Sequence, residues 1–156
     1  TTTTIEQGVY QLIKHPDQLN ILRDNPGLYP NAVEEILRYN APIHFIMSRI
    51  PLDDTEIEGT CIRKGAIVML LPAAGNRDPA RYEDPDNFDV QRNNIKQLSF
   101  GGGIHVCLGN MLARLETRVA LKTIFERFPK ISLDGEPPLR GAPASQMFSR
   151  LPVKLH

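Results

Sequence analysis

The segment FGGGIHVCLGN, residues 100–110, constrains this chain more than any other part of its sequence. Three consecutive glycines cost backbone entropy and contribute no packing, so the run needs a geometric or chemical reason. Cys107 follows the glycines and stands at the entrance of the strongest helical pattern, residues 108–128. The unpaired N–H groups and positive dipole end of a helix start favour an anion, and therefore a thiolate.

The residues around Cys107 admit several interpretations. A single cysteine at a helix start is more often buried and inert, and a glycine run is more often a turn. Zinc would need about four ligands at recognisable spacing, which Cys61, Cys107 and the four histidines do not offer. A nucleophilic cysteine needs a base with an orienting partner, a geometry that His105 does not specify. A thiolate as single axial ligand suits haem iron, and these residues alone leave the choice open.

Composition excludes several broad classes of protein. The 156 residues carry 18 basic and 18 acidic side chains, and 41% of them are hydrophobic. This balance favours neither nucleic acid nor an acidic membrane surface as a partner. The longest apolar runs, such as residues 66–74, are too short to span a bilayer. We therefore expect a cytoplasmic protein with two free thiols, no nucleic acid and no membrane.

Periodicity predicts a mainly α fold with small β-sheets (α+β). Helices are expected at about 2–14, 16–23, 31–39 and 108–128, with Asn31 as cap of the third. Residues 43–50 and 55–71 are typical of short extended segments, and residues 76–99 of a long ordered loop held by Tyr82 and Phe88. In the last helix, the expected core-facing residues are Met111, Leu112, Leu115, Val119, Ile124 and Phe125.

Residues 100–109 match the haem-binding signature of the cytochrome P-450 family, F-x-x-G-x-H-x-C-x-G, in its bacterial form. EILR (35–38) resembles the E-x-x-R helix of that family. RIPLDDTEIEG (49–59) resembles its arginine-led strand segment, and GNRDPARYEDPDNFDVQR (75–92) its loop before the cysteine. LGNMLARLE (108–116) is similar to its proximal helix. The chain also opens on a threonine run inside a helical pattern, so we expect residues 1–156 to be the C-terminal haem-binding portion of a single larger domain, with the N-terminal portion absent.

The resemblance implies a role for each matching residue. Cys107 would be the thiolate ligand of haem b, and His105 and Arg49 would bind the haem propionates. Phe100 would pack beside the sulfur, while the tight loop would depend on Gly101, Gly103 and Gly109. Glu35 and Arg38 would form a structural ion pair. The third basic residue of the family pattern falls at Asn87, a departure for which Arg81 or Arg92 would compensate.

Further residues are assigned by the same resemblance. Segments 42–47 and 144–148 would line a pocket for a small apolar organic substrate, through Ile43, Phe45, Met147 and Phe148. A basic patch of Arg114, Arg118 and Lys122 would receive a ferredoxin or flavodoxin-like electron donor, which carries electrons from NAD(P)H. The catalytic threonine of the family falls at Thr1 or one residue before it, and its acidic partner lies outside the sequence.

The implied activity of the full-length parent is that of a haem-thiolate monooxygenase, which inserts one oxygen atom from dioxygen into its substrate. The isolated chain is expected to be inactive. Two alternatives stay open. One is a peroxide-dependent peroxygenase, which needs no electron donor, and the other is a truncated, non-catalytic haem-binding protein.

Overall fold

The computed structural model describes residues 1–140 and 147–156. Its helices are α1 (Thr2–Lys14), α2 (Pro16–Asp24), α3 (Tyr29–Tyr39), α4 (Pro72–Gly75) and α5 (Asn110–Arg127), with short 3-10 turns η1 (Pro26–Leu28) and η2 (Gly103–His105). The strands are β1 (Ile46–Arg49), β2 (Thr55–Ile57), β3 (Thr60–Ile62), β4 (Val68–Leu70), β5 (Ser132–Leu133) and β6 (Val153–Lys154). The strands of these described ranges form antiparallel pairs, β1 with β4, β2 with β3 and β5 with β6. The predicted mainly helical fold with small sheets is confirmed.

Prolines set the ends of the first helices. α1 ends before His15, whose φ of −121° is extended, because the residue that precedes a proline avoids the helical region. Pro16 then begins α2. The prediction that Asn31 caps α3 is wrong, because Pro30 fits the first turn and the helix already begins at Tyr29. The Asn31 amide instead donates to the carbonyls of Val90 and Arg92, at 2.7 and 3.0 Å.

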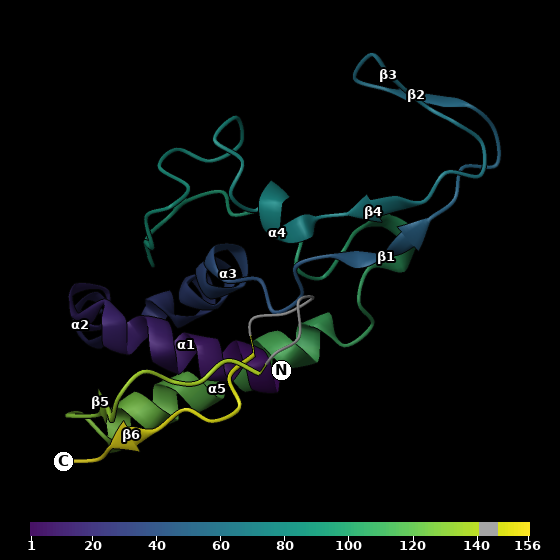
Figure 1. Ribbon diagram of the computed structural model, residues 1–156. Coiled ribbons are helices and arrows are strands. Elements are labelled where there is room, and N and C mark those ends of the chain that lie inside the picture. The colour runs from purple at the N-terminus through teal and green to yellow at the C-terminus, as the bar shows by residue number, and fades with distance from the viewer. Residues whose placement is uncertain (141–146) are drawn as a thin grey trace.

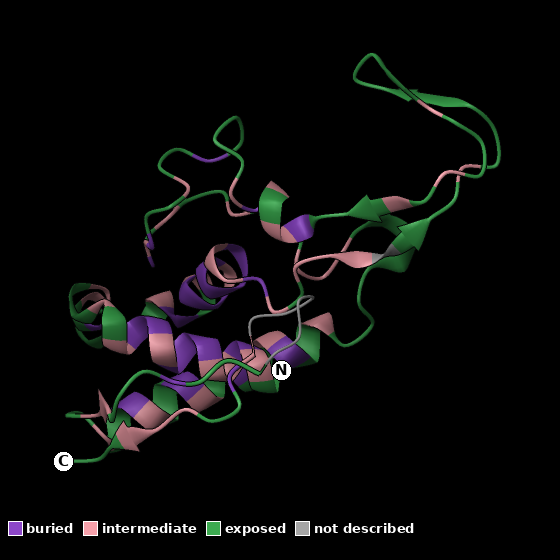
Figure 2. Cartoon of the chain, viewed as in Figure 1, coloured by how far each residue is buried: buried purple, intermediate pink, exposed green. Residues whose placement is uncertain are grey.

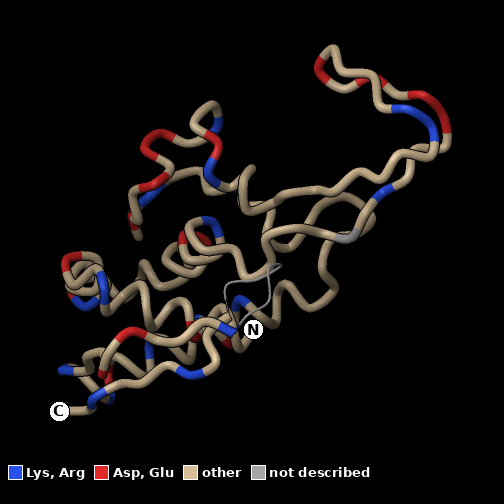
Figure 3. The backbone as a smooth tube through the Cα atoms, viewed as in Figure 1, with Lys and Arg blue, Asp and Glu red and all other residues tan. Residues whose placement is uncertain are grey.

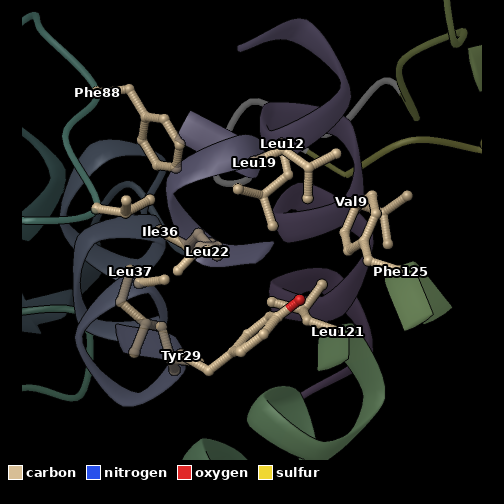
Figure 4. Close-up of a cluster of buried hydrophobic side chains, with 13 residues drawn as sticks. Val9, Leu12, Leu19, Leu22, Tyr29, Ile36, Leu37, Phe88, Leu121 and Phe125 are labelled. Carbon is tan, nitrogen blue, oxygen red and sulfur yellow. The ribbon is translucent and has the colours of Figure 1, made fainter. Parts of the chain in front are cut away.

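The hydrophobic core lies where α1, α2, α3 and α5 meet (Figure 4). Leu12, Leu22, Ile36 and Leu121 are fully buried there, and Phe88 reaches the core from the 76–99 segment. Gly8 allows α1 to lie close to α5, since a Cβ at this position would stand 2.8 Å from Leu121 Cδ1. The core therefore fixes the helix that follows Cys107 against the first helix of the chain.

The face of α5 that meets the core differs from the expected one. Met111, Leu112, Leu115 and Val119 are between 47% and 72% exposed. The buried residues are Ala113, Thr117, Leu121 and Phe125, four apart along the helix, and Ile124 is partly buried against them. The close approach of α1 selects this face of α5, because the small side chains of Ala113 and Thr117, near the start of α5, leave room for a neighbouring backbone. Of the predicted stripe, Ile124 and Phe125 contact the core.

The β2–β3 hairpin projects away from the helices (Figure 1), and its residues are almost all exposed (Figure 2). Its turn lies at Glu58 and Gly59, whose φ angles of 47° and 74° belong to the left-handed region that favours glycine. Acidic and basic side chains are interspersed along the hairpin and most of the chain (Figure 3). The β1–β4 pair links this hairpin to the helical part.

Residues 76–99 form an irregular segment that is nevertheless tied to α3. Tyr82 and Phe88 are buried, which confirms that these two side chains hold the segment in place. The Arg77 guanidinium donates to the Tyr39 carbonyl at 2.9 and 2.5 Å and stacks 3.8 Å from the Tyr39 ring. The last carbonyls of a helix have no intrahelical N–H, so this segment supplies donors that α3 lacks.

Candidate functional site

The loop that carries Cys107 closes on itself through backbone hydrogen bonds. The Cys107 N–H donates to the Phe100 carbonyl at 2.8 Å, and the Gly101 N–H donates to the Leu98 carbonyl at 2.8 Å. Gly101 and Gly103 have φ angles of 71° and 60°, which explains why glycine stands at these two positions. The loop thus presents Cys107 as an exposed side chain just before α5.

Arg114 joins this loop to two helices. Its guanidinium lies 4.6 Å from the centre of the Phe100 ring and donates to Asn110 Oδ1 at 2.6 Å. It also pairs with the Glu34 carboxylate of α3, with Nε 2.5 Å from Oε1. The Asn110 amide in turn donates to the Cys107 carbonyl at 2.6 Å. Arg114 therefore holds the first turn of α5 and the Phe100 ring in a fixed arrangement, a role that its helical spacing alone did not indicate.

A cleft of about 360 Å³ opens beside Cys107. Seven of the residues singled out in the sequence line it, namely Thr1, Ile43, Phe100, Gly101, His105, Cys107 and Met147. The other lining residues are Thr3, Thr4, Leu37, Pro42, Ile46, Pro72 and Ser99. Pro42 and Ile46 belong to the expected pocket segment 42–47, and no site role was expected of the other five. The structure thus brings the exposed thiol, the imidazole and a mostly apolar wall to one place.

The remaining predicted site residues lie elsewhere. Arg49 ends β1, where its Cα pairs with Val68, and Gly109 directly precedes α5. Phe45 is half-buried just before β1 and does not line the cleft. Phe148 is buried against α1, with its ring edge-on to Tyr10 at 4.9 Å. Residues 144–146 of the expected substrate segment lie outside the described residues.

Glu35 and Arg38 form a fully buried ion pair. Arg38 Nε and Nη2 lie 2.7 and 2.8 Å from the two carboxylate oxygens of Glu35. Arg92 completes a charged triad, with its Nε 3.3 Å from Glu35 Oε1. Arg81 lies instead near the Tyr82 ring, at 5.8 Å. Of the two arginines considered for the place of Asn87, Arg92 is the one that contacts Glu35.

Arg38 also binds the irregular segment. Its guanidinium donates to the carbonyls of Asn76, Pro85 and Asn87, at 3.0, 2.8 and 3.1 Å. Arg92 donates to the same Asn87 carbonyl at 3.0 Å. The triad therefore fixes the backbone that leads to the cysteine loop.

The donor set beside the cleft fits a flat cofactor that a single thiolate would hold. An exposed sulfur, an apolar wall and an imidazole at the same opening match an iron porphyrin with charged edge groups. Within residues 1–140 and 147–156, no group of three or more His, Cys, Asp or Glu side chains could hold a metal ion. In the same ranges no helix is long and apolar enough to cross a membrane.

Comparisons with known proteins show which family the chain resembles. The profile of the family "Cytochrome P450" matches residues 27–155. "Cytochrome P450 105C1" of Streptomyces sp is 46% identical over 156 residues, which is 98% of this chain and 41% of that protein. The "6-deoxyerythronolide B hydroxylase" of Saccharopolyspora erythraea is 48% identical over 126 residues, 81% of this chain and 31% of that protein.

Solved structures give the same result for the fold. P450BioI in complex with an acyl carrier protein ligated to hexadec-9Z-enoic acid matches with a TM-score of 0.96 and 42% identity, over 99% of this chain and 40% of that one. The tirandamycin C-bound monooxygenase TamI matches with a TM-score of 0.95 and 36% identity, over 100% of this chain and 40% of that one. The chain spans less than half the length of these relatives.

Proposed function

The chain belongs to the cytochrome P450 family, and from this membership we propose that it is the C-terminal haem-binding portion of a haem-thiolate monooxygenase. Bacterial monooxygenases and hydroxylases are among its relatives. The observation that carries the proposal is the exposed Cys107, held at the edge of an apolar cleft beside Phe100 and His105. The lengths of the relatives support the view that further chain completes the domain.

Haem, when bound, would supply the activation of dioxygen, to which a thiolate ligand contributes by electron donation. Cys107 Sγ would be its protein ligand, and the 2.8 Å bond from the Cys107 N–H to the Phe100 carbonyl would fix the direction of that side chain. His105 at the cleft and Arg49 at the end of β1 would bind the two carboxylates of the haem edge. Thr1 Oγ1 would hold a proton near the opening of the cleft.

The cleft favours a small apolar organic substrate. Its lining includes Leu37, Ile43, Ile46 and Met147, which would exclude water from the reacting face. Phe45 and Phe148 do not line this cleft in the chain as it stands, so Ile43 and Met147 are the better candidates for substrate contact. A titration of the full-length protein with apolar organic molecules, followed by the haem spectrum, tests this preference.

A ferredoxin or flavodoxin-like protein would deliver electrons from NAD(P)H to the same side of the molecule as α5. Arg118 and Lys122 are exposed on this helix, one turn apart, and their charge would attract an acidic donor. Arg114 is engaged with Glu34 and Phe100, so its contribution to docking would be smaller. The relative P450BioI has been seen with an acyl carrier protein, which makes a carrier-bound substrate a second form to assay.

The experiment that tests the function uses the full-length protein loaded with haem. A thiolate-type reduced carbon-monoxide spectrum is expected first. Turnover with isotope-labelled dioxygen, NAD(P)H and a ferredoxin system should then place one labelled oxygen atom in the product. Turnover that depends on peroxide and takes no label from dioxygen would establish the peroxygenase alternative. Absence of the thiolate-type spectrum would refute both activities.

A further inference from the structure

Asn76 directly follows α4, begins the irregular segment 76–99 and is completely buried. It is not among the cleft-lining residues, although Pro72 of α4 and its partners Ser99 and Leu37 are. We propose that Asn76 is a positioning residue for Cys107, through which the end of α3 holds the backbone that leads into the cysteine loop. The role is stated on the premise of the haem-thiolate function proposed above.

Both ends of the Asn76 amide are used. Oδ1 accepts a hydrogen bond from the Leu98 N–H at 2.7 Å, and Nδ2 donates to Ser99 Oγ at 3.0 Å. Nδ2 also lies 3.4 Å from the Leu37 carbonyl, at the limit of a hydrogen bond. An asparagine side chain offers one acceptor and two donor hydrogens in a fixed plane, which aspartate, leucine and alanine do not. The site therefore requires the amide and not merely its volume.

Ser99 repeats the connection to α3. Its hydroxyl donates to the Leu37 carbonyl at 2.6 Å. Leu37 lies in the last turn of α3, where backbone carbonyls have no intrahelical partner, so both polar side chains satisfy the same helix end. Asn76 is in turn held through its backbone, since its carbonyl accepts from Arg38 at 3.0 Å and its N–H donates to Pro72 at 2.9 Å.

The connection continues to the cysteine through two backbone hydrogen bonds. Leu98, whose N–H is bound by Asn76, offers its carbonyl to the Gly101 N–H at 2.8 Å. Phe100, the residue after Ser99, offers its carbonyl to the Cys107 N–H, also at 2.8 Å. Gly75 keeps Leu98 close, because a Cβ there would stand 3.0 Å from Leu98 Cδ1. Leu98, Ser99 and Phe100 are thus each held by a hydrogen bond, and the Asn76 side chain binds the first two.

Asn76→Ala removes the acceptor for Leu98 and a donor for Ser99, so the backbone at 98–100 should open more often. Asn76→Asp keeps the acceptor for the Leu98 N–H, but a carboxylate oxygen would face the Leu37 carbonyl where the wild type has an amide donor. This variant should therefore also open the backbone at 98–100 more often. Ser99→Ala removes the hydroxyl that donates to the Leu37 carbonyl and accepts from Asn76 Nδ2, but it leaves the bond from the Leu98 N–H to Asn76 Oδ1. Ser99 is half-buried, so this variant should remain foldable and show a smaller effect. Asn93→Ala is the matched control, because Asn93 is exposed in the same segment.

The test uses the full-length protein with haem and has two readouts. The first is the share of bound haem that gives the thiolate-type reduced carbon-monoxide spectrum, compared at equal haem content. The second is hydrogen exchange at the Gly101 and Cys107 amides. We expect Asn76→Ala to lower the thiolate share severalfold and to speed exchange on the order of tenfold, as the loss of two partly buried hydrogen bonds implies. Ser99→Ala should follow with a smaller change, and Asn93→Ala should match the wild type.

A variant Asn76→Ala that keeps both the wild-type thiolate share and the wild-type exchange rates would overturn the positioning role. So would a variant that loses soluble yield or haem while the remaining haem keeps its wild-type spectrum. If Asn76→Ala does not fold, Ser99→Ala decides by the same criteria. A wild-type protein without a thiolate-type spectrum would refute the proposed function instead, and the exchange rates would still test Asn76.

Discussion

The buried triad gives the sharpest prediction about stability. Arg38→Ala removes five hydrogen bonds at once, two to Glu35 and three to the carbonyls of Asn76, Pro85 and Asn87. Both side chains of the pair are 0% exposed, so water cannot replace the lost donors. We expect the variant to lose folding stability and haem together, and not the oxygen chemistry alone.

The magnitude follows from what the truncation leaves behind. Glu35 keeps two partners, Arg92 at 3.3 Å and the Asp89 N–H at 3.0 Å, so its charge is not wholly unpaired. The Asn87 carbonyl keeps Arg92, whereas the carbonyls of Asn76 and Pro85 lose their arginine donor. Breaking a buried pair costs about 3–5 kcal/mol. The partners that remain on Glu35 place the expected loss towards the lower end, about 3 kcal/mol.

Urea denaturation of the full-length protein measures this loss, and haem content is measured on the same samples. The matched control is Arg63→Ala, which breaks an ion pair of 2.9 Å with Asp54 in an exposed position. Exposed pairs contribute about 0–1 kcal/mol. An Arg38→Ala variant that unfolds no more easily than Arg63→Ala, or one that is stable and fully haem-loaded but inactive, would refute the reasoning.

Three further outcomes are expected. In the full-length protein, Cys107→Ser should abolish the thiolate-type reduced carbon-monoxide spectrum and Cys61→Ser should leave it unchanged; a retained spectrum in the first variant would exclude Cys107 as ligand. Burial raises the pKa of Glu6 above its ordinary 4.5, so the folded state binds the proton more tightly and stability falls as pH rises through that raised pKa. Glu6→Gln should therefore raise the free energy of unfolding near neutral pH and change it little below pH 4.5. Equal changes in the free energy of unfolding in these two pH ranges would contradict the pKa shift. Residues 1–156 alone should bind haem weakly and associate, since Met111, Leu112 and Leu115 are exposed together; a monomer with tight one-to-one haem binding would show otherwise.

The parts of the fold that short-range chemistry decides could be predicted from the sequence. Pro16 separates the first two helices, and the bounds of α1 follow from it. The glycines at 101 and 103 mark left-handed backbone, and Tyr82 and Phe88 mark an irregular segment that is packed and not free. The gathering of Cys107 and His105 at one cleft also agrees with their spacing in the motif, although their roles toward haem stay predictions.

Other features depended on contacts between distant segments. α5 has apolar residues on more than one side, and only the approach of α1 at Gly8 decides that Thr117 and Leu121 face the core. Arg81 and Arg92 are equivalent candidates in the sequence, and the path of the backbone after Phe88 alone brings Arg92 to Glu35. Asn76 lies in the segment 75–92 that resembles the family's loop, but it carries no charge and follows no periodic pattern, so only its complete burial and its hydrogen bonds to Leu98 and Ser99 marked it as a positioning residue.

The carbonyl end of α3 has a consequence for how the chain can be cut or lengthened. Segment 76–99 lacks regular structure, yet Arg77 and Arg38 connect its backbone to that helix end. A protease needs several residues of backbone to come free at once, and in most of this segment they could do so only if the end of α3 opened as well. Residues 93–94 are exposed, and Asn94 already adopts a left-handed turn. The first cleavage by a protease, and the insertions that the fold tolerates, should therefore concentrate at residues 93–94. A single residue inserted between 85 and 88 would instead displace the Pro85 and Asn87 carbonyls, which accept hydrogen bonds from Arg38 and Arg92.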